Sequence, residues 1–396
     1  MNMNEQMKES EESILHTYNR FPVVFEKGQG CYLYDSEGKE YLDFAAGIAV
    51  NSLGYHYPGY DEALKDQIDK LMHISNLYYN EPIIEAGAKL VKASKMSKAF
   101  FTNSGTEAIE GALKAAKKYA YVRDGHADHE IIAMNHSFHG RSIGALSVTG
   151  TAHYREPFEP LMGGVKFADF NDLESVKAQI TDKTCAIITE VVQGEGGIYP
   201  AKKEFLEGLR QICDEKDIML IFDEIQCGMG RTGHYFAWQA YGVQPDIMTS
   251  AKALGCGVPV GAFVLNEKAA KASLEPGDHG TTYGGNPFVC AAVSKVFDIY
   301  ENDKIIEHVQ EMTPYLEQKL DEIVAKYECA ATRRGMGFMQ GIVIQGRPVG
   351  EVVKAALAKG LLVISAGSDV LRIVPPLVIT KEHIDKMAAI LDECME

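Results

Sequence analysis

Short strand-like runs alternate with helical patterns from about residue 60 to about residue 300, and this alternation constrains the fold most. Between the runs, apolar residues recur with helical spacing, as in Ala108, Ile109, Ala112 and Leu113. Because strands that alternate with helices are buried on both faces, the pattern predicts an α/β fold with a mainly parallel central sheet. The strand candidates are KAFFTN, EIIAMN, CAIITEVV, IMLIFDEI, PDIMTS and GAFVLN.

The N-terminal and C-terminal parts of the chain lack the regular strand–helix alternation of the middle part. A chain of 396 residues exceeds what one hydrophobic core usually organises. GCYLYDSEGKEYLDF indicates a small hairpin with its turn at Asp35 to Gly38, and the residues after Pro287 indicate an α+β domain with a last helix from Lys381. We therefore expect an N-terminal segment (1–60) that packs with a small C-terminal domain (301–396), and a large domain (61–300) between them.

Charge and composition exclude several classes of protein. The net charge is −16 and there is no basic stretch, so nucleic acid is not an expected partner. The first residues are polar and acidic, unlike a secretory signal, and no apolar run reaches the roughly 18 to 20 residues that cross a bilayer. The eight cysteines contain no CxxC pair, which favours buried thiols over disulfides or zinc ligands. We expect a cytoplasmic enzyme without a metal or a membrane partner.

Ligands of open α/β sheets bind beyond the carboxyl ends of the strands, so the residues that end the strand runs are the candidates for a site. After KAFFT comes NSGTEA, in which Ser104 and Glu107 fit a helix capping box. The amides of Gly105 and Thr106 also fit a phosphate held at a helix N-terminus. The two interpretations are compatible.

The segment SFHGR follows the strand candidate EIIAMN. An aromatic residue here would ordinarily belong to the core, and an arginine on a loop would ordinarily be solvated. If a planar cofactor lies at this edge, Phe138 could stack on it and Arg141 could bind a carboxylate through two hydrogen bonds.

Two further strand ends carry ionisable residues. Asp223 follows the apolar run MLIF and calls for a partner, because acids are seldom buried alone; a helix cap or an ion pair would also satisfy it. Lys252 lies in SAKALG among small and apolar residues, where desolvation would lower the pKa of its amine as a Schiff-base lysine requires. A lysine that reaches solvent is the alternative.

The segment GMGRTG, residues 228–233, matches the GxGxxG pattern of dinucleotide-binding proteins. That interpretation also needs a helix that opens there and an acid about 20 residues further on. HYFAWQAYG has no clear helix start and Asp246 comes too early, so the segment does not predict dinucleotide binding.

Taken in order, these motifs resemble those of the class III aminotransferases of fold type I, which depend on pyridoxal 5′-phosphate. The resemblance runs from about Tyr18 to the C-terminus and rests on NSGTEA, SFHGR, EVVQGEGG, FDEIQCGMGRTG, SAKALG and HGTTYGGNP. One departure is Val191, where the family often has proline; we expect it to leave the catalytic roles unchanged.

The resemblance assigns roles to individual residues. Lys252 would carry the cofactor and shuttle the proton, and Asp223 would keep the pyridine nitrogen protonated. Phe138 would stack on the ring and Gln226 would bond its hydroxyl group. The phosphate would be held by Gly105 and Thr106 with Ser104 at the same turn, and by Thr282 of a neighbouring subunit, which implies a homodimer. The substrate-binding residues would be Arg141, Glu195, Arg372 and Ile48.

Within the class, the resemblance is strongest to the acetylornithine aminotransferases of arginine biosynthesis, on TYNRFPVVFEKGQG, HISNLYYNEP, GDHGTTYGGNP and VLRIVPPLVIT. It implies transfer of the δ-amino group of N-acetyl-L-ornithine to 2-oxoglutarate, which gives N-acetyl-L-glutamate 5-semialdehyde and L-glutamate. Arg372 would bind the α-carboxylate of glutamate, and Glu195 would neutralise Arg372 when the ω-amine is bound. Ile48 offers no polar partner to a free α-ammonium group, which favours an acylated ornithine.

Other functions stay open at this point. Ornithine, succinylornithine or 4-aminobutyrate could be the amino donor. An NAD-dependent oxidoreductase would rest on GMGRTG alone. A catalytically inactive binding protein would require loss of the lysine or the aspartate, and both Lys252 and Asp223 are present.

Overall fold

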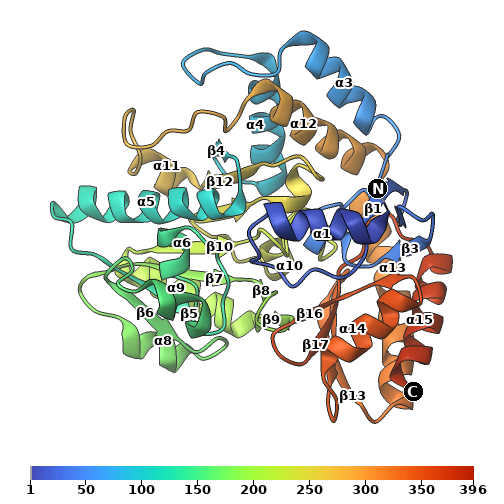
Figure 1. The fold of residues 1–396 in the computed structure, drawn as a ribbon. Helices are drawn as coiled ribbons and strands as arrows, with labels where there is room; N and C mark the ends of the chain where they lie inside the picture. The colour runs from blue at the N-terminus through green and yellow to red at the C-terminus, as the bar shows by residue number, and fades with distance from the viewer. Residues whose placement is uncertain (1) are drawn as a thin grey trace.

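The computed structural model describes residues 2–396; Met1, the first residue of the predicted N-terminal segment, lies outside them. At its centre is a sheet that, within those residues, has seven strands in the order β4-β12-β11-β10-β7-β5-β6 (Figure 1). Strand β12 runs antiparallel to both of its neighbours, and the pairs from β11 to β6 are parallel. The strands are β4 (Lys98–Thr102), β5 (Glu130–Met134), β6 (Val165–Ala168), β7 (Thr184–Glu190), β10 (Met219–Asp223), β11 (Ile247–Ser250) and β12 (Gly261–Leu265).

This sheet confirms the predicted α/β fold, and six of its strands are the six predicted ones. The seventh, β6, was not predicted. It lies at the edge of the sheet and its sequence, VKFA, is short and only partly buried, so it lacks the apolar run that marks the inner strands.

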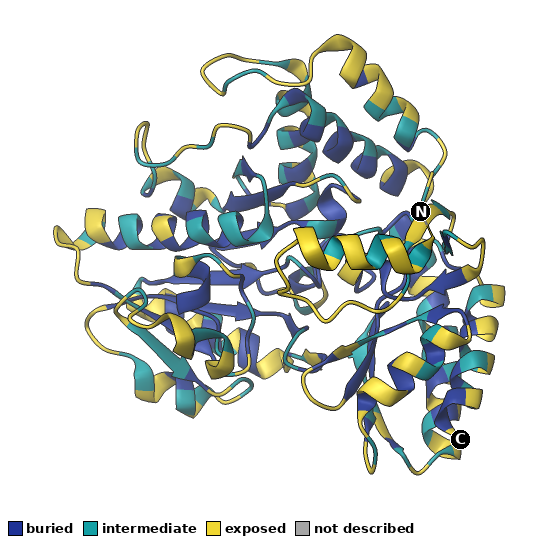
Figure 2. Ribbon diagram, viewed as in Figure 1, coloured by how far each residue is buried: buried dark blue, intermediate teal, exposed yellow. Residues whose placement is uncertain are grey.

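Helices cover both faces of the sheet because alternate strand residues point to opposite sides. In β10, Ile221 packs in one apolar cluster with the helix α5, whereas Leu220 and Phe222 pack in another with the helix α9. The inner strands of this sheet, β5, β7, β10, β11 and β12, are almost wholly buried, whereas the edge strands β4 and β6 are partly exposed (Figure 2). The surrounding helices are α3 (Tyr60–Lys70), α4 (Glu81–Ser94), α5 (Gly105–Asp124), α6 (Ile143–Ser147), α7 (Ala152–Arg155), α8 (Leu173–Gln179), α9 (Lys203–Lys216), α10 (Trp238–Tyr241), α11 (Glu267–Lys271) and α12 (Pro287–Asn302), with the 3₁₀ turns η1 (Glu156–Phe158) and η2 (Lys252–Leu254).

The C-terminal elements, orange to red in Figure 1, lie to one side of the central sheet. They form an antiparallel sheet in the order β13-β14-β17-β16, packed against helices. Its elements are α13 (Ile305–Lys326), β13 (Ala330–Met336), β14 (Met339–Ile344), α14 (Val349–Ala358), β16 (Ile364–Ala366), β17 (Val370–Ile373) and α15 (Lys381–Met395). The predicted last helix from Lys381 is confirmed.

The N-terminal segment joins these C-terminal elements through a small sheet in the order β1-β2-β3-β15. The predicted hairpin is confirmed as β2 and β3, which pair with Tyr34 opposite Glu40. Strand β15 comes from the C-terminal part of the chain and pairs in parallel with β3, Leu361 opposite Leu42. The elements are α1 (Met3–Ser13), β1 (Phe25–Gln29), β2 (Tyr32–Asp35), β3 (Glu40–Asp43), α2 (Ala46–Ala49) and β15 (Leu361–Leu362), and a further short pair is β8 (Val192–Gln193) with β9 (Tyr199–Pro200).

Within residues 2–396, none of the helices combines the length and the apolar character that crossing a bilayer requires.

Candidate active site

The strand ends that the sequence singled out meet around one cavity of about 430 Å³. The ends of β7, β10 and β11 all lie at its wall, as expected for a ligand site at the carboxyl edge of a parallel sheet. Its lining includes eight residues of the predicted site and His139 of the SFHGR motif: Ser104, Gly105, Thr106, Phe138, His139, Arg141, Asp223, Gln226 and Lys252.

Asp223 is the last residue of β10 and is almost completely buried. Its Oδ1 accepts hydrogen bonds from the amide of Ile225 at 3.0 Å and from the hydroxyl of Thr249 at 3.2 Å. Its Oδ2 is hydrogen-bonded to Nδ1 of His139 at 2.7 Å. These partners are an amide, a hydroxyl and an imidazole, so within the described residues no lysine or arginine neutralises the carboxylate by direct contact. The site therefore presents an oriented negative charge to whatever the cavity holds.

Lys252 begins the η2 turn just after β11 and holds a left-handed backbone conformation, with φ of +50°. Burial lowers the pKa of its amine to about 8, and the charge of Arg372 acts in the same direction, while Glu195, Asp223 and Glu190 oppose it. Among residues 2–396 nothing hydrogen-bonds this amine. A desolvated amine with a lowered pKa is neutral far more often than an ordinary lysine, so it is suited to nucleophilic attack.

The helix α5 begins at the cavity. Ser104 caps it, since its hydroxyl accepts from the amide of Glu107 at 3.3 Å. The predicted capping box is only half formed, because Glu107 reaches the amide of Asn103, at 2.7 Å, instead of that of Ser104. As the first two helical residues, Gly105 and Thr106 have amides without an acceptor inside the helix, which suits an anion.

Phe138 and Arg141 stand on the loop that follows β5. The Arg141 guanidinium lies over the ring of Tyr154 at 3.9 Å and near that of Phe138 at 5.3 Å. Arg141 is exposed, whereas Phe138 is half-buried. The two aromatic rings thus hold a cation at the cavity wall, in reach of a carboxylate that enters from solvent.

Arg372, on β17, forms a two-pronged ion pair with Glu195: Nη1 lies 2.5 Å from Oε1 and Nη2 lies 3.3 Å from Oε2. Gln226 bridges the pair to the cavity, because its Oε1 accepts from Arg372 at 3.1 Å and its amide group donates to Glu195 at 3.4 Å. Burial alone would raise the pKa of Glu195, but Arg372 outweighs it and holds that pKa below the usual value. The arginine is almost completely buried, so its charge needs a partner at all times.

Four residues of the predicted site are absent from the lining of this cavity: Glu195 and Arg372, which Gln226 joins to it, and Ile48 and Thr282. Ile48 is 43% exposed and left-handed, with φ of +66°, and among the described residues it is Val50 that lines the cavity nearby. Thr282 is exposed and is also absent from the lining. Their expected roles stay predictions.

The sequence reasoning missed three residues that surround Asp223. His139 stands inside the SFHGR motif, and a histidine after a strand end was a usable signal for a carboxylate partner. Thr249 and Glu190 lie directly opposite Asp223 on the neighbouring strands β11 and β7. Burial, and then the charge of Asp223, raise the pKa of Glu190 well above its usual value.

Glu190 connects two walls of the cavity. Its Oε2 accepts from the amide of Phe138 at 3.3 Å and its Oε1 accepts from the amide of Gly194 at 3.1 Å. It thereby ties the loop that carries Phe138 to the loop that carries Glu195.

The GMGRTG segment is built into the packing between the central sheet and the C-terminal elements. No helix of the described chain begins within it, and α10 starts only at Trp238. Instead Arg231 is fully buried and donates to the carbonyl oxygens of Phe338, at 3.3 Å, and Pro375, which fastens the segment to the C-terminal elements.

Comparison with known proteins decides the family. The family model described as aminotransferase class-III matches residues 14–395. The chain belongs to the class-III aminotransferases. The acetylornithine aminotransferase of Clostridium acetobutylicum is 48% identical over 388 residues, which cover 98% of this chain and 100% of that one.

Solved structures of aminotransferases match this chain over nearly its full length. The N-acetylornithine aminotransferase of Stenotrophomonas maltophilia is 35% identical, with a TM-score of 0.84 and 98% of each chain covered. The ornithine aminotransferase of Toxoplasma gondii is 28% identical, with a TM-score of 0.95, and the match covers 100% of this chain and 94% of that one.

Class-III aminotransferases use pyridoxal 5′-phosphate, and the cavity fits this group. The unpartnered amine of Lys252, the unneutralised carboxylate of Asp223 and the amides at the start of α5 suit its aldehyde, ring nitrogen and phosphate respectively. The fit at the helix start is tight: a Cβ atom added to Gly105 would lie 2.9 Å from Cδ1 of Ile225. The enzyme is therefore an aminotransferase dependent on this cofactor.

Proposed function

We propose that this class-III aminotransferase transfers the δ-amino group of N-acetyl-L-ornithine to 2-oxoglutarate, giving N-acetyl-L-glutamate 5-semialdehyde and L-glutamate, as in arginine biosynthesis. The observation that carries the proposal is the Arg372–Glu195 ion pair, joined by Gln226 to the cavity that contains Lys252. The names of the curated relatives, which are acetylornithine aminotransferases at 44–48% identity, support the same substrate.

The bound cofactor supplies an electron sink for the carbanion that forms when the substrate loses a proton. Lys252 removes that proton and returns it on the other side of the reaction, for which its lowered pKa near 8 is suited. Asp223 holds the proton of the ring nitrogen, and His139 and Thr249 fix the direction of its carboxylate.

The remaining cofactor contacts are those that the family resemblance implies. Ser104 would shape the turn, Gly105 and Thr106 would offer their amides to the phosphate, Phe138 would stack on the ring, and Gln226 would bond its hydroxyl group. Each of them lines the cavity. Since Gln226 also bonds Arg372 and Glu195, it would relay the position of the ring to the ion pair.

The ion pair would allow one site to accept two amino donors that differ in whether a carboxylate lies next to the reacting amine. Glutamate brings a carboxylate next to the reacting amine, and this carboxylate would displace Glu195 and bind Arg372. An ω-amine brings only hydrogens there, and Glu195 would return to neutralise the arginine, because a buried unpaired charge is strongly unfavourable. The structure holds the paired arrangement. Arg141 would bind the distal carboxylate of either substrate.

We further propose a homodimer in which the partner subunit's Thr282 completes the phosphate site. Thr282 is exposed and absent from the chain's own cavity. The loop around it contacts the loop 71–79, through the hydrogen bond of 2.8 Å from Asn76 to Gly284. Exposed apolar residues concentrated on two neighbouring loops are typical of an interface. Here they are Leu71, Met72, Leu77, Tyr78, Tyr79 and Tyr283.

The cysteines support a cytoplasmic location. All eight are unpaired among the described residues, and seven of them are buried, which fits a reducing compartment.

The substrate is tested by steady-state transamination with 2-oxoglutarate against N-acetylornithine, ornithine, N-succinylornithine and 4-aminobutyrate, compared by kcat/KM. The proposal expects a preference for N-acetylornithine of about tenfold or more over ornithine and 4-aminobutyrate, worth roughly 1.4 kcal/mol. A higher kcat/KM with any of the other donors would overturn the substrate and keep the residue roles. Ornithine is the main alternative, because the solved neighbours include ornithine aminotransferases.

A further inference from the structure

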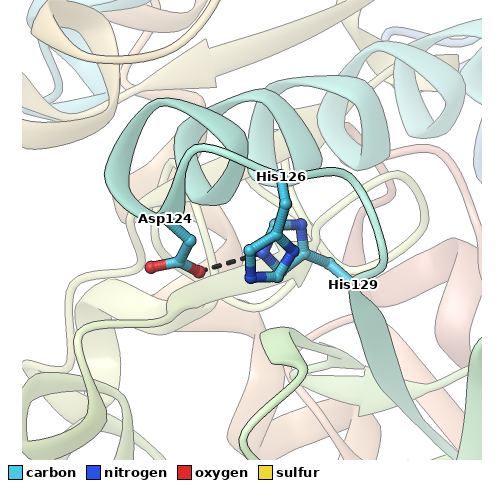
Figure 3. Close-up of side chains that lie close together, drawn as sticks. All are labelled: Asp124, His126 and His129. Atoms are coloured by element: carbon cyan, nitrogen blue, oxygen red, sulfur yellow. Dashed lines mark hydrogen bonds and ion pairs between the residues drawn. The ribbon is translucent and has the colours of Figure 1, made fainter.

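A second cluster of chemically active side chains lies at the other end of α5 from the cavity. Asp124 is the last residue of that helix, and His126 and His129 follow on the short loop that leads into β5. Their potential ligand atoms, one from each residue, all lie within 4.8 Å of one another. Figure 3 shows the two imidazole rings stacked beside the carboxylate of Asp124.

We propose that Asp124, His126 and His129 bind a divalent transition-metal cation of the zinc type. Two imidazoles and a carboxylate are ligands that Zn²⁺ accepts, and a set of three protein ligands leaves further positions for water.

The pair His129 and Asp124 already has nearly the spacing of two ligands on one metal. Nε2 of His129 lies 2.9 Å from Oδ2 of Asp124. Two ligand atoms on a tetrahedral zinc, each about 2.0–2.1 Å from the metal, are about 3.3 Å apart. If a metal replaced the proton between these two atoms, Nε2 of His129 and Oδ2 of Asp124 would have to move apart by only a few tenths of an ångström. His129 is almost completely buried, so its ring is held in place.

The third ligand is free to adjust. His126 is exposed, and its ring stacks on that of His129 with a centroid separation of 4.9 Å and an angle of 15°. Rotation of this side chain alone brings a ring nitrogen toward the other two ligand atoms. The loop reverses at Gly125, whose φ of +76° ends the helix and directs His126 back over Asp124.

Asp124 is prepared as a ligand because it is ionised and oriented. Arg123 donates to both of its oxygens, at 2.6 Å each, and this contact, with that of His129, holds the pKa of Asp124 well below its usual value. Arg123 is fixed in turn by a hydrogen bond to the carbonyl oxygen of Asp217. Carboxylates that bind metals commonly accept hydrogen bonds from neighbouring groups, which orient them in this way. The positive charge of Arg123 weakens the affinity but leaves lone pairs on the carboxylate.

The site is remote from transamination. The 20 residues of α5 span about 30 Å, and the phosphate-binding amides lie at its first turn. A metal here would fasten the end of α5 to the start of β5, and would stabilise the folded protein by mass action.

The test is a titration of the cofactor-loaded protein with Zn²⁺ by calorimetry, in the absence of substrate. The proposal predicts one saturable site per chain, weakened at least about tenfold in His126→Ala, which is a loss of about 1.4 kcal/mol. The matched control is His56→Ala, because His56 is also exposed beside a carboxylate, that of Asp61, but has no second histidine. The control should bind Zn²⁺ as the unchanged protein does.

Cobalt reports which atoms bind. Co²⁺ at the proposed site should give visible bands without a sulfur-to-metal charge-transfer band, since its ligands are nitrogen and oxygen. Three results would each overturn the proposal: no saturable binding of Zn²⁺, equal affinities in His126→Ala and the unchanged protein, or a thiolate band that assigns the metal to a cysteine.

Discussion

His139 and Asp223 share a hydrogen bond of 2.7 Å at the wall of the cofactor cavity, and this bond fixes the direction of the carboxylate. The other ring nitrogen of His139 is buried without a hydrogen-bond partner among the described residues. Among the described residues, the imidazole ring of His139 therefore hydrogen-bonds only to Asp223. It is a positioning residue, because it acts on the cofactor only through the aspartate.

Replacing His139 should impair catalysis while the fold persists. His139→Ala leaves Oδ2 of Asp223 without its donor, which is worth about 1–3 kcal/mol, so kcat should fall about 10- to 100-fold. His139→Asn retains a donor of similar reach and should recover part of the loss. The measurement is kcat together with the cofactor absorbance spectrum. If the two variants lose the same amount and show an unchanged spectrum, the positioning role is wrong.

Glu195→Gln should separate the two halves of the reaction. The variant leaves Arg372 without a neutralising charge when an ω-amine is bound, but keeps the arginine for the carboxylate of glutamate. Single-turnover rates with N-acetylornithine should fall about 10- to 100-fold, corresponding to about 1.4–2.8 kcal/mol, while those with glutamate change little. Equal losses with both donors would show that the pair has no switching role.

Gly105→Ala should weaken cofactor binding. The new Cβ would meet Ile225 at 2.9 Å, next to the amides that face the phosphate. We expect the dissociation constant of the cofactor to rise about tenfold, since overpacking of this kind is worth about 1–3 kcal/mol. The control is Gly87→Ala in α4, where the nearest atom outside the helix lies 4.0 Å away. The explanation fails if both variants bind the cofactor equally well.

The buried amine of Lys252 should make the cofactor-free protein less stable at neutral pH. Its pKa is about 8 when folded, against a usual value of 10.5, so the unfolded chain binds more protons between these values. The penalty is complete below pH 8 and disappears as the pH rises toward 10.5. Lys252→Met should therefore unfold at higher urea than the unchanged apoprotein at pH 7, by an amount on the order of 3 kcal/mol. The difference should shrink at pH 9.5; a constant difference would contradict the lowered pKa.

Much of the central sheet could be predicted because each inner strand is an apolar run that ends at a polar residue. The same rule placed Asp223 and Lys252 at one edge, and the structure brings both to the same cavity. The edge strand β6 has no such run and was missed.

The contacts around Asp223 could not be predicted, because they depend on strand order. Thr249 and Glu190 are neighbours of Asp223 only since β11 and β7 flank β10, and apolar patterns do not specify which strands are adjacent. The pairing of β3 with β15 joins residues more than 300 positions apart, which local patterns cannot reveal. The left-handed backbone of Ile48 is likewise set by its surroundings, since a β-branched residue does not favour it.

The central claim is that Lys252 carries the cofactor in the cavity beside Asp223. The direct measurement is to fix the cofactor to the protein by reduction with borohydride, digest the product and identify the labelled peptide by mass spectrometry. The account predicts one labelled peptide, containing Lys252, and a variant Lys252→Ala that takes up no label and loses at least about a thousandfold in transamination while keeping its fold. Label on another lysine, or substantial turnover in Lys252→Ala, would contradict it.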